Sequence, residues 1–210
     1  MIYAENILIF LGAPLLIGLI MLKGETRRFI GFFLLGTVVC LLCSYINAFV
    51  TAVTNTDVTQ SVIKLTPIVE EVMKALPLLF YIAVFLPKND EILSSSLALG
   101  IGFATFENCC LVTISGADSL SYALVRGFAA GTMHILCAAI LGHALTLSNA
   151  RRYLLPMGTF ASVAIAITFH AIYNLLVSAE GTWKILGYFM PLVTATLFLF
   201  IPRLMKKCCT

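Results

Sequence analysis

The chain has 210 residues, of which 60% are hydrophobic and 11% are charged, and its formal net charge is +3. Soluble domains carry about 25% charged residues, so this composition excludes a soluble enzyme or binding module. The small positive charge gives no reason to expect a nucleic-acid partner. The apolar residues come in runs of about twenty, the length that spans roughly 30 Å of hydrocarbon. We therefore expect an all-α integral membrane protein that contacts membrane lipid.

Seven apolar segments divide the chain, and they predict a bundle of about seven transmembrane helices. In chain order these segments cover about residues 4–22, 29–50, 61–87, 92–114, 120–147, 153–178 and 183–202. The polar stretches between them are short, which leaves no room for an additional soluble domain. We expect residues 1–210 to form a single membrane domain.

The basic residues between the segments are divided unequally between the two sides of the membrane. With seven spans, one side has only Lys184. The other side collects Lys23, Arg27, Arg28, Lys88, Arg151, Arg152, Arg203, Lys206 and Lys207. Cytoplasmic loops carry an excess of Lys and Arg. We therefore expect the N-terminus outside and the C-terminus in the cytoplasm.

A small set of ionisable and amide side chains falls inside the apolar segments. Charges in spans cost a few kcal/mol each on insertion scales, so they are expected to face the bundle interior and to be functional. The set contains Lys64, Glu70, Glu71, Lys74, Glu107, Arg126, His134, His143 and His170, together with Asn108 and Asn174. At 1.5 Å per residue, the acids and two of the imidazoles fall in one layer, slightly outside the midplane. His143 falls nearer the cytoplasmic end.

The stretch "VEEVMK" places two adjacent carboxylates within reach of one ammonium. Glu70 and Lys74 are spaced i,i+4, and Glu71 and Lys74 are spaced i,i+3, so either acid can pair with the lysine. The two carboxylates point about 100° apart on a helix and can hold different roles. Pro67 and Pro77 flank this stretch, and both can loosen the helix backbone.

Two imidazoles and a carboxylate are typical ligands of zinc. A further glutamate nearby could take a proton from a metal-bound water, which is the chemistry that hydrolyses amides. Asn174 lies one turn after His170 and could donate to the oxyanion. Each feature also has a simpler interpretation. Lys74 could form a purely structural ion pair, Glu107 could pair with Arg126, and the histidines could be hydrogen-bonded core residues.

Four blocks in chain order resemble the PrsW family of intramembrane metalloproteases. "EEVMK" reads as EExxK, "FATFE" followed by Asn108 reads as FxxxEN, His134 follows, and "HAIYN" reads as HxxxN. They also resemble the wider superfamily that includes the CAAX prenyl endopeptidases. The likeness covers about residues 61–178, which would be the catalytic core. CAAX-type enzymes have Arg after EExxx and His in the FxxxH block. This chain instead has Lys74 after two intervening residues and Glu107 in place of that His. Both differences favour the PrsW branch.

The resemblance implies an intramembrane endopeptidase in a bacterial plasma membrane. Its substrate class would be single-span membrane proteins such as anti-sigma factors, cut on the extracytoplasmic side. A metal-free version of the superfamily mechanism would use Glu70 to activate water, with His170 and Asn174 stabilising the oxyanion.

We accordingly expect Glu70 or Glu71 to be the general base, with the other acid held by Lys74. We expect Glu107, His134 and His170 to bind Zn²⁺. Asn174, together with Asn108 or Arg126, would orient or polarise the substrate. Two other classes of protein stay open: a proton-coupled transporter or channel that uses the buried Glu and His side chains as a relay, and a non-catalytic membrane scaffold.

Overall fold

The computed structural model describes residues 4–115, 120–149 and 151–208, and this part of the chain is almost entirely helical. The main helices are α1 (Ala4–Met21), α2 (Gly24–Thr54), α4 (Thr66–Phe85), α5 (Asn89–Ser115), α7 (Gly131–Asn149), α8 (Leu155–Ser178) and α9 (Thr182–Cys208). Shorter elements lie between them: α3 (Val58–Lys64), α6 (Leu120–Val125), the π-helical turn η1 (Arg126–Ala130) and the 3₁₀ turn η2 (Arg152–Leu154).

Five regions are long and apolar enough to cross a membrane among the residues searched. They are Ala4–Met21, Gly24–Thr54, Asn89–Thr113, Leu120–Asn149 and Leu155–Ser178. The prediction of an all-α, multi-pass membrane protein is therefore confirmed. Helix α4 is not among the five, although it is 20 residues long. It carries three charged side chains, and these are the residues that the sequence marked as a candidate site.

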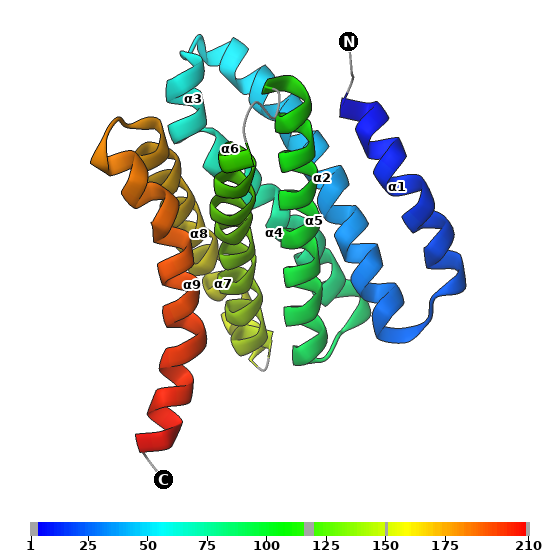
Figure 1. Ribbon diagram of the computed structural model, residues 1–210. Helices are drawn as coiled ribbons and strands as arrows, with labels where there is room; N and C mark the ends of the chain where they lie inside the picture. The colour runs from blue at the N-terminus through cyan, green and yellow to red at the C-terminus, as the bar shows by residue number, and fades with distance from the viewer. Residues whose placement is uncertain (1–3, 116–119, 150, 209–210) are drawn as a thin grey trace.

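The helices form one bundle in which α5 lies between α2 and α7 (Figure 1). Helix α8 packs against α7, α9 packs against α8, and α1 lies on the outside of α2. Helix α4 contacts both α2 and α8. The chain runs alternately up and down, so that α1 begins and α9 ends at opposite ends of the bundle (Figure 1).

Two glycines allow close approach of the neighbours of α5. A Cβ at Gly102 would overlap the backbone of Phe33 on α2. A Cβ at Gly100 would overlap the Ala138 side chain and press on the carbonyl of His134, both on α7. Small residues at helix interfaces let backbones come together in membranes. Gly100 thereby brings α7 close to the part of α5 that carries Glu107, and Gly102 brings α2 close to it.

The apolar segment at about 61–87 does not form one continuous helix, so that expectation is wrong. Helix α3 ends at Lys64, and α4 begins at Thr66. Pro67 lies in the first turn of α4, where its missing N–H would have no helical partner in any case. It therefore starts the helix rather than loosening it. Lys64 is exposed at the end of α3 and lies outside the buried polar cluster.

Candidate active site

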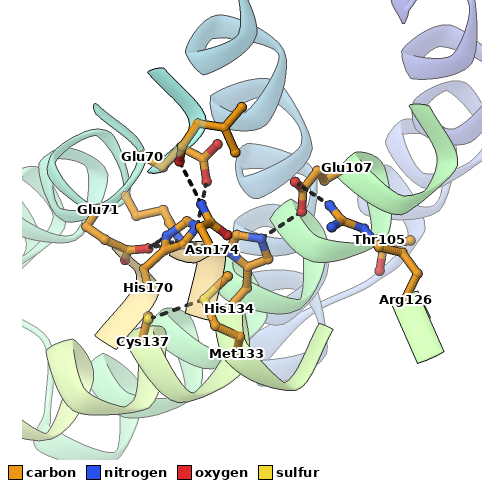
Figure 2. Close-up of polar contacts among 12 residues, drawn as sticks. Glu70, Glu71, Thr105, Glu107, Arg126, Met133, His134, Cys137, His170 and Asn174 are labelled. Carbon is orange, nitrogen blue, oxygen red and sulfur yellow. Dashed lines mark hydrogen bonds and ion pairs between the residues drawn. The ribbon is translucent and has the colours of Figure 1, made fainter. Parts of the chain in front are cut away.

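Four long helices and the π-helical turn bring most of the predicted polar residues together inside the bundle (Figure 2). These residues are Glu70, Glu71 and Lys74 from α4, Glu107 from α5, Arg126 from η1, His134 from α7, and His170 and Asn174 from α8. Apolar clusters pack on two sides of the group: one contains Val39, Cys43 and Phe106, and the other contains Met133, Cys137 and Tyr173.

Glu71 and Lys74 form a buried ion pair at the centre of the site. Lys74 Nζ donates to Glu71 Oε1 at 2.7 Å, and the same oxygen lies 2.8 Å from Nδ1 of His170. Lys74 Nζ also lies 3.2 Å from Nδ1 of His134. One ammonium therefore links a carboxylate on its own helix to an imidazole on α7, and Glu71 extends the link to an imidazole on α8.

The second half of the network runs through Glu107 toward the edge of the bundle. Nε2 of His134 lies 2.7 Å from Oε2 of Glu107, and Arg126 Nη2 donates to the other oxygen of this carboxylate at 2.9 Å. The side chains of Glu107 and Arg126 are 24% and 25% exposed, whereas His134 is 1% exposed. This ion pair is the more open side of the site.

The π-helical turn sets the direction of Arg126 relative to His134. Residues eight apart on a regular α-helix point about 80° apart. A π turn takes up one extra residue, which turns the later part of the helix back by about 100° and puts these two side chains on nearly the same face. Both of them contact Glu107 as a result. Such π turns are frequent at functional sites.

Glu70 and His170 face each other without a hydrogen bond between them. Nδ1 of His170 contacts the Glu71 carboxylate, which can only accept, so we assign the ring proton to Nδ1 and leave Nε2 as an acceptor. Oε2 of Glu70 lies 4.0 Å from this nitrogen, and it is buried without a hydrogen-bond partner. Two acceptors thus point at each other across a short gap (Figure 2).

The two asparagines occupy different places. The Asn174 side chain is buried, and its Nδ2 donates to the carbonyl oxygen of Val62 on α3 at 2.9 Å. The break between α3 and α4 leaves this carbonyl in need of a partner. Asn108 is not part of the network among the described residues. Its side-chain oxygen is buried without a hydrogen bond, and the residue lines an apolar pocket together with Phe10 of α1.

His143 lies away from the site, as its depth in the sequence indicated. Its ring packs on Phe198 of α9, with the ring centroids 5.3 Å apart, and the residue is exposed.

Glu70, His134 and His170 are grouped closely enough to hold a metal ion. Each offers one ligand atom, and these atoms lie within 4.8 Å of one another. The unpartnered Oε2 of Glu70 and the Nε2 of His170 that lies 4.0 Å from it fit this role. His134 could be the third ligand if one of its ring nitrogens gave up its present contact, which is with Lys74 at Nδ1 or with Glu107 at Nε2. The ligand set expected from the sequence has Glu107 in place of Glu70 beside the two histidines.

The fold and the site define a multi-pass membrane protein with a buried Glu–Lys–His centre. The sequence model described as "PrsW family intramembrane metalloprotease" matches residues 25–201. The chain therefore belongs to the PrsW family of intramembrane metalloproteases, which confirms the resemblance noted in its motifs. The match begins after the end of α1. No curated protein and no solved structure gave a match.

Proposed function

We propose that this protein is an intramembrane endopeptidase that cleaves a peptide bond of a membrane-anchored protein. The observation that carries the proposal is the pair of facing acceptors, Glu70 Oε2 and His170 Nε2, 4.0 Å apart. A water molecule has two protons to donate, and hydrogen bonds of about 2.8 Å to both atoms are compatible with that separation. The water is then oriented, and Glu70 accepts its proton as the oxygen attacks the peptide carbonyl.

Glu71 and Lys74 prepare His170 for this role. Glu71 accepts the Nδ1 proton at 2.8 Å, which fixes the ring orientation and keeps the lone pair of Nε2 directed at Glu70. Lys74 in turn fixes Glu71 at 2.7 Å. These contacts support Glu70 as the base, with Glu71 as the acid that Lys74 holds.

Asn174 is the proposed donor to the substrate carbonyl. Its amide already holds a peptide carbonyl, that of Val62, at 2.9 Å. The same N–H could stabilise the developing oxyanion of a substrate that displaces Val62. Arg126 would act indirectly, by holding Glu107 against His134.

Zn²⁺ is the proposed metal of a second version of this site, in which Glu70, His134 and His170 would hold the ion in place of the two hydrogen bonds to water described above. When bound, it would make water more acidic and would polarise the carbonyl. In the set expected from the sequence, Glu107 replaces Glu70. Measurements of metal content in variants distinguish the two sets, as described below.

We further propose that α4 and α9 also cross the membrane, which gives seven spans with the N-terminus outside. The alternation of helix direction (Figure 1) and the excess of Lys and Arg in alternate loops support this topology. The site would then lie in the extracytoplasmic half, near α3. Single-span proteins of a bacterial plasma membrane, anti-sigma factors among them, are the proposed substrates.

The test uses the purified full-length protein in liposomes with a panel of single-span substrates, and mass spectrometry of the products. We expect a defined cleavage within or next to the substrate span. Glu180→Gln serves as the matched control, because Glu180 is exposed in the loop before α9. Proton or ion flux without any peptide product would contradict the proposal and would favour a transporter.

A further inference from the structure

Phe103 of α5 contacts two side chains at the centre of the site, Lys74 and His134. Lys74 Nζ sits over the face of its ring, 4.5 Å from the centroid. The ring also packs against the imidazole of His134, with centroids 5.0 Å apart and an interplanar angle of 49°. Phe103 is fully buried. Its ring therefore contacts both groups that Glu71 and Glu107 hold from the other side.

The ammonium of Lys74 has three N–H donors, and the structure offers three acceptors for them. Glu71 Oε1 lies at 2.7 Å, and His134 Nδ1 lies at 3.2 Å. The third acceptor is the π face of Phe103. Lys74 is only 1% exposed, so water has little access to solvate it. A buried ammonium without partners is strongly disfavoured, and a cation over an aromatic face is stabilised most where it is desolvated.

We propose that Phe103 is a positioning residue that holds the Lys74 ammonium through the negative potential of its ring face. This inference rests on the function proposed above. Lys74 contacts Glu71 and His134, and Glu71 contacts His170. Both imidazoles are therefore positioned through one ammonium, and Phe103 determines where that ammonium sits.

The sequence of α5 places the ring in this position. Gly100, Phe103 and Glu107 lie on one stripe of the helix, at spacings of three and four residues. Gly100 allows the backbone of α5 to approach that of α7 at His134. The next residue on the stripe presents its ring to Lys74 and His134, and Glu107 then reaches Nε2 of His134.

Graded fluorination of the ring tests the proposal, because fluorine weakens the negative potential of the face and changes the ring size little. The full-length protein is prepared with mono-, di- and trifluorophenylalanine at position 103. The matched control carries the same series at Phe106, which is also buried on α5 but has no ring contact with Lys74. We expect kcat/KM to fall stepwise at Phe103, by about tenfold across the series, and to stay level at Phe106. Phe103→Trp, which keeps an aromatic face, should retain more activity than Phe103→Leu.

A second measurement needs no substrate, so it separates this inference from the proposed function. The unfolding temperature in detergent should fall stepwise with fluorination at Phe103, and this trend should vanish in a background that combines Lys74→Met with Glu71→Gln, which leaves neither charge buried without its partner. Equal trends at Phe103 and Phe106, or a trend at Phe103 that persists without Lys74, would overturn the inference. A wild-type protein that cleaves nothing but shows the Lys74-dependent unfolding trend would count against the endopeptidase and not against the role of Phe103.

Discussion

Glu71 and Lys74 form an ion pair of 2.7 Å whose side chains are 2% and 1% exposed. Two charges one helical turn apart are thus kept inside the helix bundle. Such a pair contributes little net stability, but the loss of one partner leaves the other charge buried and uncompensated. The stretch of sequence that looks least suited to a membrane is therefore explained by mutual neutralisation on the inner face of α4.

Removing one partner of this pair should be costly. Glu71→Gln is expected to lower the free energy of unfolding by about 3–5 kcal/mol, because Lys74 loses its carboxylate. The double variant Glu71→Gln with Lys74→Met should recover most of that loss, since both charges are gone. Denaturation in detergent measures both variants. Losses that simply add in the double variant would contradict the pairing.

The ion pair between Glu107 and Arg126 should behave differently, because both side chains are about a quarter exposed. Arg126→Gln is expected to change the free energy of unfolding by no more than about 1 kcal/mol. Glu107→Gln should reduce cleavage more strongly than Arg126→Gln, because it weakens the partner of His134 Nε2. Unfolding curves and cleavage rates of the two variants, measured side by side, check this order. The reverse order would mean that His134 does not depend on Glu107.

Metal content should depend on Glu70 rather than on Glu107. After dialysis against Zn²⁺ and removal of free metal, we expect Glu70→Gln and His170→Ala to lose bound zinc, and Glu107→Gln to keep it. The basis is the grouping of Glu70 with the two histidines. Elemental analysis of the purified variants gives the answer. Loss of zinc in Glu107→Gln with retention in Glu70→Gln would favour the ligand set read from the sequence.

The topology can be tested by labelling introduced cysteines in a cysteine-free background. Asn89→Cys at the start of α5 and Thr182→Cys at the start of α9 lie at helix ends that should face opposite sides of the membrane. A membrane-impermeant thiol reagent applied to intact cells should label position 182 and not position 89. Labelling at position 89 alone would indicate the opposite orientation. Labelling at both positions would contradict the proposed topology, in which they lie on opposite sides of the membrane.

Hydropathy predicted the helical bundle well, because long apolar runs have few alternatives in a membrane. It did not show the break at Leu65, because Lys64 and Thr66 interrupt the apolar run only briefly, and Pro67 is the one residue that marks the start of α4. The π turn at Arg126 was also missed. A single extra residue in a stretch of small and apolar side chains leaves no mark in the hydrophobic pattern.

Helical spacing predicted which residues could meet, and the structure brings most of them together, with Asn108 left outside the network. It could not separate the roles of Glu70 and Glu71, because both lie within one turn of Lys74. Tertiary packing makes the distinction: α8 brings Nδ1 of His170 to Glu71 and leaves Nε2 facing Glu70. The contact of Asn174 with Val62 had no signal in the sequence, because it depends on where α3 ends.

The most direct test of the central claim compares Glu70→Gln with wild type in single-turnover cleavage of a reconstituted single-span substrate. Glu70 Oε2 has no hydrogen-bond partner, so the variant should fold with nearly wild-type stability. We expect its cleavage rate to fall by about a hundredfold or more, as for the loss of a general base. A Glu70→Gln protein that is folded and cleaves at the wild-type rate would contradict the account.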